Sequence, residues 1–409
     1  MSLTNKIFLA LIFGALIGSI LNYLALQQNA LILNFISVPA GLFISSLKML
    51  VVPVVFFSIV CGVSNLNNIN SLGKIGGKSI FLYLLTTCIA ISIALIISKI
   101  INPGYNGEVN NFQDFTKKVG PSISEVITGI IPNNPIKALV EANMLQIIFF
   151  AVLLGTTINL LNDKSKKLKE YFNIFNDLFL KMIEVIMSFA PYGVFFLIFK
   201  TFFTQGFDAI LNLASYFFTV LLILLIHMFF TYGSLILLFT RINIYKFFSK
   251  MKNTILFAFS TASSAATIPI TLKTVEKDLG VDKSVASFTV PLGATINMDG
   301  TAIMQGVATV FIANVYGINL LMSDYLSVII IATLASIGTA GVPGVGLIML
   351  TMVLNQVGLP AEGIAIIIGI DRLLDMTRTA VNVTGDATIS CLVGKFENKI
   401  DIKKINLKS

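Results

Sequence analysis

The chain has 409 residues, of which 56% are hydrophobic and only 12% are charged. Soluble domains carry about 25% charged residues, so the composition excludes an ordinary soluble protein and indicates an integral membrane protein. The net charge is +8, and the basic residues lie beside apolar segments, which favours contact with anionic lipid headgroups over binding to nucleic acid.

Six apolar stretches in the first 240 residues are long enough to cross a bilayer as helices. They lie at roughly 6–26, 33–61, 75–101, 143–162, 173–200 and 212–240. The first is too long for the apolar core of a signal peptide and lacks a cleavage motif, so we expect it to remain as a transmembrane helix. Three scattered cysteines, Cys61, Cys88 and Cys391, show no metal-binding spacing and are interpreted as small core residues.

Basic residues mark the side of the membrane on which each connection lies. They gather at Lys74 and Lys78, and at 164–169, 241–252, 273–283 and 395–408. The connections 103–135 and 202–211 carry little excess positive charge. Because cytoplasmic connections are enriched in Lys and Arg, we expect the basic connections and both termini in the cytoplasm.

Two apolar segments of the second half do not have the form of simple spanning helices. Segment 253–272 carries basic residues on both sides, which predicts a re-entrant hairpin with residues 260–266 at its tip. Segment 326–356 is interrupted at 336–346 by glycines and a proline, which favours a second hairpin that enters from outside. The non-helical backbone at the tip of such a hairpin is tolerated within the membrane only where it lines a cavity or the protein interior.

Each interrupted segment precedes a similar polar motif. Asn-Met-Asp-Gly-Thr stands at 297–301, and Asn-Val-Thr-Gly-Asp stands at 382–386. Paired interrupted segments in corresponding halves are typical of the midplane binding site of a secondary transporter, and opposite entry sides indicate inverted repeats.

A polar stripe runs along the last apolar segment. Its members are Asp371, Asp375, Arg378, Asn382 and Asp386. Successive members are separated by four, three, four and four residues. A helix places all of them on one face. Each Asp or Arg facing lipid would cost roughly 2.5–3.5 kcal/mol, so the stripe must face protein, water or ions. Arginine recognises carboxylates and aspartate holds ammonium groups, so Arg378 and Asp375 suit a zwitterion with an additional acid group. A purely structural ion pair is the alternative.

Five motifs spread over the chain carry a family resemblance. They are Leu-Lys-Met-Leu-Val-Val-Pro (47–53), Phe-Ala-Pro-Tyr-Gly-Val (189–194), Pro-Leu-Gly-Ala-Thr-Ile-Asn-Met-Asp-Gly-Thr (291–301), Ser-Ile-Gly-Thr-Ala-Gly-Val-Pro-Gly (336–344) and Asp-Met-Thr-Arg-Thr-Ala-Val-Asn-Val-Thr-Gly-Asp (375–386). With these motifs the chain resembles the dicarboxylate/amino acid:cation symporters, which include archaeal aspartate transporters and animal excitatory amino acid transporters.

The resemblance implies an all-α polytopic membrane protein with eight transmembrane helices, two re-entrant helical hairpins and inverted repeats, assembled as a homotrimer. It implies scaffold helices 1–2 in residues 1–72 and scaffold helices 4–5 in residues 104–205. Helix 3 in residues 73–103 would join residues 206–409 in a transport domain that moves as an elevator. The implied elements after helix 6 are hairpin 1 at about 245–278, helix 7 at about 283–316, hairpin 2 at about 324–357 and helix 8 at about 361–395.

The resemblance also implies the substrate contacts. Arg378 matches the arginine that binds the substrate's side-chain carboxylate, and Asp375 matches the aspartate that binds its α-amino group. Thr379 and Asn382 match positions that contact the amino and α-carboxylate groups. The remaining positions of the substrate cage are Thr301, Ser263 and Ser264, with Val342 and Gly346 on the outer hairpin as the lid.

Several co-transported sodium ions are implied as well, because broken helices supply the free carbonyl oxygens that such ions require. The first set of ligands is Asp386 with the carbonyls of Gly293, Asn297 and Asn382. The second set is the carbonyls of Thr295, Met298, Ser336, Ile337 and Thr339. The third set is Tyr83, Thr86 and Thr87 with Asn297 and Asp299.

The expected function is a sodium-coupled symporter in the cell membrane that imports L-aspartate and/or L-glutamate, with hairpin 2 as the extracellular gate. It is not expected to be an enzyme. The alternative is a proton-coupled or broader-specificity amino acid/dicarboxylate carrier of the same family. The resemblance implies an arginine that sets the first aspartate of the cluster, either on the first hairpin or beside that aspartate in helix 8. The corresponding positions here are Ala262 and Met376, and Arg372 is a candidate substitute. Gln305 replaces a glutamate of the animal members, which predicts transport without potassium counter-transport.

Two other functional classes compete with this interpretation. An intramembrane hydrolase could use Asp371 and Asp375 as a dyad or Ser264 as a nucleophile, but Arg378 would keep both carboxylates ionised, and Ser264 has no evident base. A passive channel would need neither a zwitterion site nor lid-like hairpins. His227, the only histidine, is interpreted as a packing residue because its helix holds no acidic neighbour, with a proton relay as the alternative.

Overall fold

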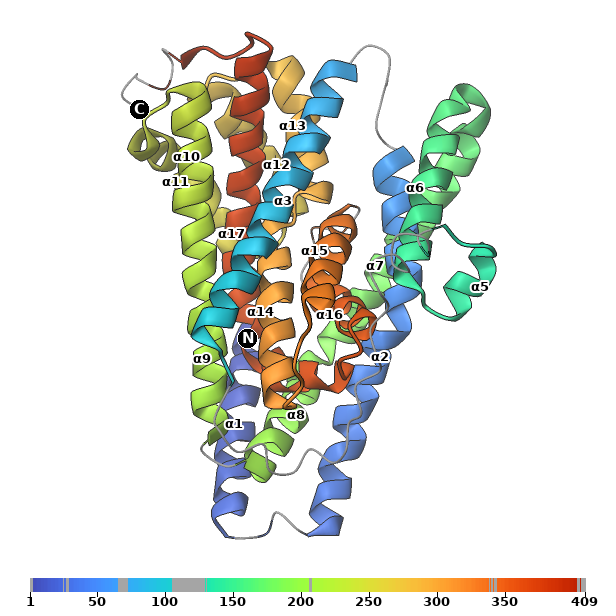
Figure 1. Cartoon of the computed structure of the whole chain (residues 1–409), viewed down its shortest axis with the longest axis vertical. Helices are drawn as coiled ribbons and strands as arrows, with labels where there is room; N and C mark the ends of the chain where they lie inside the picture. Colours follow the sequence, from blue (N-terminus) through green and yellow to red (C-terminus); the bar gives the residue numbers. More distant parts are fainter. Residues whose placement is uncertain are drawn as a thin grey trace.

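The computed structural model describes residues 3–24, 26, 29–64, 73–104, 129, 131–205, 208–337, 339, 341, 344–402 and 405. These residues are predominantly helical, and most of the helices run along the long axis of the molecule (Figure 1). The one β-interaction among them is an isolated antiparallel bridge between Val281 and Ile400. The expected all-α class is therefore confirmed.

The first half of the chain forms helices close to the expected apolar stretches. They are α1 (Leu3–Tyr23), α2 (Ala30–Ser64), α3 (Gly73–Ile101), α5 (Pro135–Val140), α6 (Met144–Leu160), the short η1 (Asn162–Ser165), α7 (Lys166–Ser188) and α8 (Ala190–Gln205). The stretch 173–200, expected as one helix, is instead divided between α7 and α8, which bend by 55° at the break. Pro191 explains the division, because a proline in the first turn of α8 has no N–H to donate to the preceding turn.

The next helix changes its winding along its length. It runs as α9 (Asp208–Ile226), the π-helical η2 (His227–Tyr232), α10 (Gly233–Leu235) and the π-helical η3 (Ile236–Thr240). It ends at Arg241, which adopts a left-handed conformation with φ of 59°. Insertions of π-helix are rare and are frequent at functional sites.

The elements of the second half are α11 (Ile244–Thr261), α12 (Ser264–Lys273), η4 (Thr274–Asp278), α13 (Lys283–Ile296), α14 (Asp299–Val315), α15 (Met322–Ser336), α16 (Val345–Gln356), η5 (Ala361–Gly363) and α17 (Ile364–Phe396). The breaks between α11 and α12 and between α15 and α16 fall in the two segments that were expected to be interrupted. The expected helix 7 is instead divided into α13 and α14, because Asn297 and Met298 leave the helical conformation. Between α11 and α12, Ala262 takes a left-handed conformation. The number of spans, the entry sides of the hairpins and the inverted repeat stay predictions.

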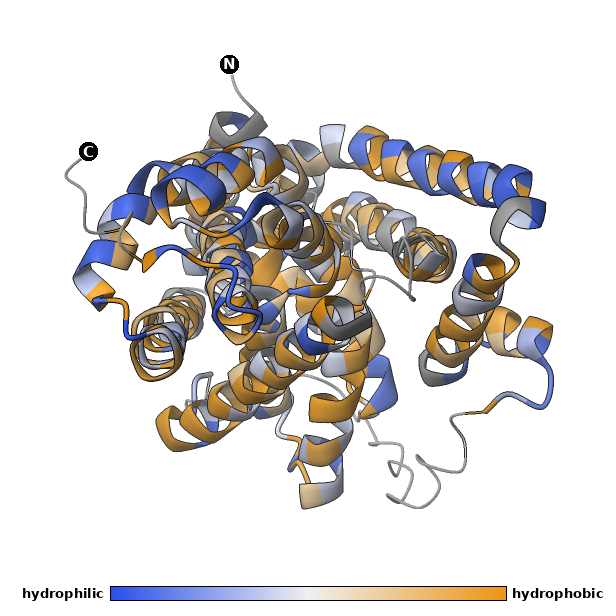
Figure 2. Ribbon diagram, turned by 90° about the horizontal axis from the view of Figure 1, so that it is seen from above, coloured by the Kyte–Doolittle hydropathy of each residue, from blue (hydrophilic) through white to orange (hydrophobic). Residues whose placement is uncertain are grey.

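The helix surfaces fit a lipid environment. Among the described residues, two continuous helices are long and apolar enough to cross a membrane, Ile75–Ile101 and Leu211–Thr240, and the bent pair α7–α8 would add a third. Large apolar side chains lie exposed on outer faces, for example Phe35, Ile100 and Phe230. Figure 2 shows apolar residues along the helices that run through the molecule and hydrophilic residues near the C-terminal end. These features indicate a multi-pass membrane protein.

The helices pack in two groups that meet along α17. In one group α1 packs on α8, and α2 packs on α6, α7 and α8. In the other, α3 packs on α14 and α15, while α9, α11, α13 and α14 pack on α17. Small residues permit the closest approaches, because a Cβ atom at Gly14 would lie 2.7 Å from the carbonyl oxygen of Phe195.

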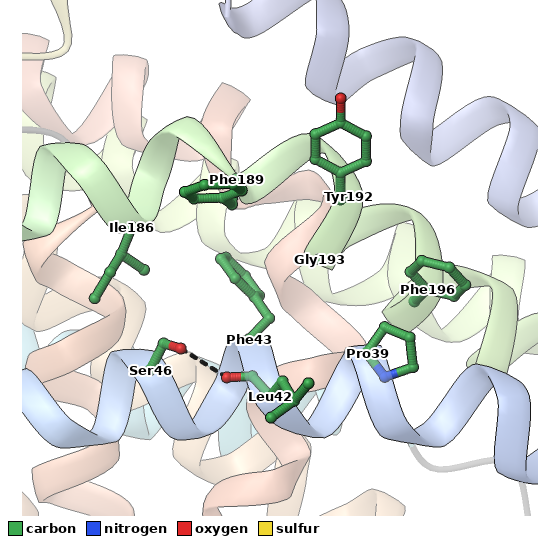
Figure 3. A pocket seen from close by; sticks show the side chains of 9 residues that line it. All are labelled: Pro39, Leu42, Phe43, Ser46, Ile186, Phe189, Tyr192, Gly193 and Phe196. Atoms are coloured by element: carbon green, nitrogen blue, oxygen red, sulfur yellow. Dashed lines mark hydrogen bonds between the residues drawn. The ribbon is translucent and has the colours of Figure 1, made fainter.

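An apolar groove lies at the bend between α7 and α8 (Figure 3). Its volume is about 240 Å³, and its lining residues are Pro39, Leu42, Phe43, Ser46, Ile186, Phe189, Tyr192, Gly193 and Phe196. Gly193 lies directly against the ring of Phe43, where any larger residue would collide. Among its lining residues the groove holds no Asp, Glu, Lys, Arg or His side chain, whereas α17 carries several buried charges.

Candidate functional site

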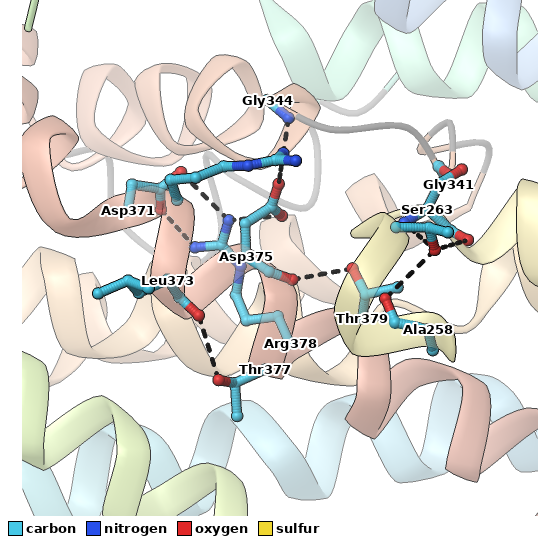
Figure 4. Close-up of polar contacts among 12 residues, drawn as sticks. Ala258, Ser263, Gly341, Gly344, Asp371, Leu373, Asp375, Thr377, Arg378 and Thr379 are labelled. Carbon is cyan, nitrogen blue, oxygen red and sulfur yellow. Dashed lines mark hydrogen bonds and ion pairs between the residues drawn. The ribbon is translucent and has the colours of Figure 1, made fainter. Parts of the chain in front are cut away.

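A buried charge cluster surrounds Arg378 in the middle of α17. Arg378 is 1% exposed. Its Nη1 atom donates to Asp371 Oδ1 at 2.5 Å, and its Nη2 atom donates to Asp371 Oδ2 at 3.3 Å and to Asp375 Oδ1 at 2.9 Å. The polar stripe expected from the spacing is therefore present, and Asp371, which had no expected role, is the bidentate partner of the arginine (Figure 4).

Asp375 connects this cluster to the loop between α15 and α16. Its Oδ2 atom accepts a hydrogen bond from the backbone N–H of Gly344 at 3.4 Å. The same oxygen lies 3.8 Å from Arg372 Nη1, so Arg372 stands where a substitute for the missing family arginine was expected. Thr379 donates its hydroxyl proton to the carbonyl of Asp375 at 2.8 Å, within α17.

The loops of the two interrupted segments meet beside the cluster. Ser263 donates its hydroxyl proton to the carbonyl of Gly341 at 2.8 Å, as Figure 4 shows, and the Ala265 N–H donates to the same carbonyl at 3.2 Å. A Cβ atom at Gly341 would lie 3.0 Å from the Cβ of Ser264. The expected lid residue Val342 lies outside the described residues. The structure thus brings both loop tips together.

Thr301 and Gly346 complete the surroundings of the arginine. A Cβ atom at Gly346 would lie 3.3 Å from Arg378 Nη2 and 3.4 Å from Cγ2 of Thr301. The Nε atom of Arg378 is buried and has no hydrogen-bond partner among the described residues. One donor of the guanidinium therefore remains for an acceptor that the described chain does not supply.

A second polar cluster lies where α13 gives way to α14. Asn297 donates through Nδ2 to Asp386 Oδ1 at 2.9 Å and to the carbonyl of Asn382 at 2.8 Å. The amide N–H of Gly300 donates to Asn382 Oδ1 at 2.7 Å. Gly293 lies so close to Asp386 that a side chain there would collide with the carboxylate. The members of the first expected sodium set are therefore neighbours.

Asp299 forms the centre of a third polar cluster. Its Oδ1 atom accepts the hydroxyl proton of Thr87 on α3 at 2.5 Å. Thr86 and Thr87 also lie 3.0 and 2.9 Å from the carbonyl oxygen of Tyr83. Of the third expected sodium set, Thr87 therefore contacts Asp299, and Tyr83 and Thr86 lie in the same turn of α3. Asn297 contacts Asp386 and Asn382 instead.

His227 differs from its expected surroundings. It was interpreted as a packing residue without an acidic neighbour, but its Nε2 atom lies 3.0 Å from Asp299 Oδ2. Tyr232 donates its hydroxyl proton to the same oxygen at 2.7 Å. No local sequence pattern signals these contacts, because the carboxylate belongs to a helix 72 residues further along the chain.

The second expected sodium set is less closely assembled. Thr295, Ser336 and Thr339 each turn the hydroxyl toward a carbonyl of a preceding residue. Met298 accepts a hydrogen bond from Asn382 Nδ2 at its sulfur atom, and Ile337 ends α15 in an extended conformation. The two segments adjoin where a Cβ atom at Gly341 would lie 2.8 Å from the carbonyl of Ala294.

The buried carboxylates differ in whether a positively charged side chain compensates them. Asp371 and Asp375 are compensated by Arg378, but among the described residues neither Asp299 nor Asp386 forms an ion pair with a lysine or arginine. The Oδ1 atom of Asn297, whose Nδ2 atom donates to Asp386, is buried without a hydrogen-bond partner among the described residues. Buried carboxylates without compensation are costly, so oxygen ligands arranged in this way suit a monovalent cation.

The competing catalytic arrangements find no support in this geometry. Asp371 and Asp375 each form an ion pair with Arg378, and no hydrogen bond joins the two carboxylates in the described structure, so they do not form a dyad. Ser264 begins α12, and the only histidine contacts Asp299 instead.

Comparisons with known proteins agree with the geometry. A family model described as the sodium:dicarboxylate symporter family matches residues 3–396. A proton/sodium-glutamate symport protein of Geobacillus stearothermophilus is 33% identical, over 98% of this chain and 95% of that protein. A proton/glutamate-aspartate symporter of Escherichia coli is 33% identical, over 98% and 94%. Excitatory amino acid transporter 3 of Mus musculus is 31% identical, over 92% and 82%.

The close approach of α14 to α17 gives a testable prediction. Gly300→Ala would place a Cβ atom 2.7 Å from the Arg378 carbonyl oxygen and 2.9 Å from its Cα. Because backbone atoms must then move, we expect a loss of about 1–3 kcal/mol in stability, measured as a lower melting temperature of the purified protein. Gly77→Ala is the matched control, since nothing lies within 4 Å of its Cβ position. Equal melting temperatures for the two variants would contradict the packing described.

Proposed function

Because the chain belongs to the sodium:dicarboxylate symporter family, we propose that it imports an acidic amino acid, L-aspartate and/or L-glutamate, together with sodium ions. Members of this family are transporters, so the protein is not an enzyme. The amino acid and the sodium ions are its cargo, and the membrane in which it acts is the cell membrane.

The observation that carries the proposed substrate is the buried guanidinium of Arg378 beside Asp375. A guanidinium in a site almost closed to water recognises a carboxylate with directed hydrogen bonds, and its unpartnered Nε–H supplies a donor for one. Asp375 offers a negative charge to an ammonium group 2.9 Å from the arginine. An acidic amino acid carries both groups, so we assign its side-chain carboxylate to Arg378 and its α-amino group to Asp375.

The rest of the substrate cage follows from the same neighbourhood. Thr379 and Asn382 lie on α17 in the turns after Asp375 and would contact the amino and α-carboxylate groups. Thr301, Ser263, Ser264, Val342 and Gly346 would complete the cage. The support for this assignment is that Thr301 and Gly346 adjoin Arg378 and that Ser263 contacts the loop before α16.

Sodium coupling is supported by the two buried carboxylates, Asp299 and Asp386, that have no lysine or arginine partner among the described residues. We assign one ion to Asp386 with Gly293, Asn297 and Asn382, and one to Asp299 with Tyr83, Thr86, Thr87 and Asn297. A further ion would use the carbonyls of Thr295, Met298, Ser336, Ile337 and Thr339. Bound cations would neutralise carboxylate charges that are costly in a dry interior. The buried Oδ1 atom of Asn297, which has no hydrogen-bond partner among the described residues, could serve as a further oxygen ligand.

The transport mechanism that we propose is an elevator. Hairpin 2, formed by α15 and α16, would act as the extracellular gate, since the Gly344 N–H already contacts Asp375. The group of α1, α2 and α6–α8 would form the trimeric scaffold, and the group around α17 would move. A small cavity beside Asp371, Arg372 and Asp375 is also lined by Phe43 and Val194, so the site borders both groups. Both termini would lie in the cytoplasm.

A proton-coupled carrier of the same substrates is the second candidate. The names of the relatives from Geobacillus stearothermophilus and Escherichia coli include proton coupling. A measurement of which ion drives uptake distinguishes the two candidates. A carrier of broader amino acid or dicarboxylate specificity is distinguished by competition with succinate.

Uptake into proteoliposomes tests the proposed function. An inward sodium gradient should drive accumulation of labelled L-aspartate, and omission of internal potassium should leave the rate unchanged, because Gln305 is not an ionisable residue. Replacement of external sodium by choline should abolish uptake, and a proton gradient alone should not restore it. Uptake that is indifferent to sodium, or that requires internal potassium, would contradict the proposal.

Arginine variants test the assigned substrate contact. Arg378→Lys keeps the charge but loses the forked donor geometry, so we expect at least a tenfold rise in the aspartate concentration for half-maximal uptake. Arg378→Ala leaves two buried carboxylates without compensation, and a loss of about 2–5 kcal/mol in binding is expected. Arg241→Lys, at an exposed position, is the matched control and should behave as wild type. Wild-type uptake by Arg378→Lys would remove the arginine from the substrate site.

A further inference from the structure

Two side chains outside the expected cation ligands hold the carboxylate of Asp299. His227 Nε2 lies 3.0 Å from Asp299 Oδ2, and the Tyr232 hydroxyl donates to the same atom at 2.7 Å. All three side chains are completely buried. The other carboxylate oxygen, Oδ1, instead faces α3, where Thr87 donates to it at 2.5 Å.

The π-helical segment η2 makes this joint contact possible. His227 and Tyr232 are five residues apart, and an α-helix would turn them toward different faces, since it aligns residues three and four apart. The i→i+5 winding of a π-helix brings residues five apart onto one face. The two rings accordingly lie 4.6 Å apart, edge to face, and both point to Asp299.

The hydrogen bonds fix which carboxylate oxygen is offered to the cation. Oδ2 already has two partners, whereas Oδ1 has only the hydroxyl of Thr87, which can turn to the Tyr83 carbonyl 2.9 Å away. The Nδ1 atom of His227 is buried without a partner among the described residues. Because a carboxylate oxygen accepts hydrogen bonds, the contact of Nε2 with Oδ2 assigns a proton to Nε2.

We propose that His227 and Tyr232 are positioning residues of the cation site around Asp299. They hold Oδ2 so that Oδ1 points to the oxygens of Tyr83, Thr86 and Thr87, and they thereby set the sodium affinity of this one site. The inference rests on the proposed sodium coupling. Hydrogen-bond partners that orient a metal ligand in this way typically change metal affinity 10–100-fold when they are removed.

The test is the sodium dependence of aspartate binding to the purified full-length protein in detergent. Tyr232→Phe removes only the hydroxyl, and His227→Leu removes the imidazole donor. Each should raise the sodium concentration for half-maximal binding by about tenfold, while aspartate affinity at saturating sodium stays near that of wild type. His227→Gln keeps a side-chain N–H donor and should restore part of the lost sodium affinity.

A matched control and an Asp299 variant separate the possible results. Thr219→Val removes a buried hydroxyl of the same helix that bonds only to the carbonyl of Ser215, and its sodium dependence should equal that of wild type. Asp299→Asn should shift the sodium dependence at least as far as His227→Leu. If only Asp299→Asn shifts it, and the other variants merely lower the melting temperature, the positioning role is overturned. If Asp299→Asn also leaves it unchanged, the proposed cation site itself fails.

Discussion

The buried charge of Arg378 is the constraint on which the site depends. A guanidinium that is 1% exposed inside an apolar bundle requires carboxylate partners, and Asp371 and Asp375 supply them from the same helix. The polar face of α17 accordingly lies toward α14 and the loop before α16. Removal of either partner would leave a charge in a medium that cannot solvate it, and the proposed recognition of an anionic group depends on this cluster.

Interrupted helices provide the remainder of the site. The break at Asn297 and Met298 places the side-chain amide of Asn297 against Asp386 and begins the next helix at Asp299. Glycines at 293, 300 and 346 let neighbouring helices approach without a side chain between them. Asn382 contacts both Asn297 and Gly300. If it binds the amino acid and a cation as we propose, the two sites share one residue, and loss of either ligand would change the hydrogen bonding around the other.

The sequence indicated some of these features and could not indicate others. The spacing from Asp371 to Asp386 predicted one polar helix face, and the glycines and prolines predicted the broken segments, because both patterns are local. The contact of His227 with Asp299 is not local, and it depends on a π-helical winding that hydrophobic periodicity does not reveal. Asp371 was visible as a charge, but its bidentate pairing depends on side-chain conformations. The apolar composition of residues 173–200 predicted one continuous helix, but the structure bends at Pro191 and divides this stretch between α7 and α8.

Calorimetric binding to the purified protein tests the central claim most directly, because it separates recognition from transport. L-Aspartate and L-asparagine share the α-amino and α-carboxylate groups and differ only in the charge that we assign to Arg378. The account predicts that aspartate binds in sodium chloride and not in choline chloride, and that asparagine binds at least about a hundredfold more weakly. Equal affinities for the two amino acids, or aspartate binding that ignores sodium, would contradict it.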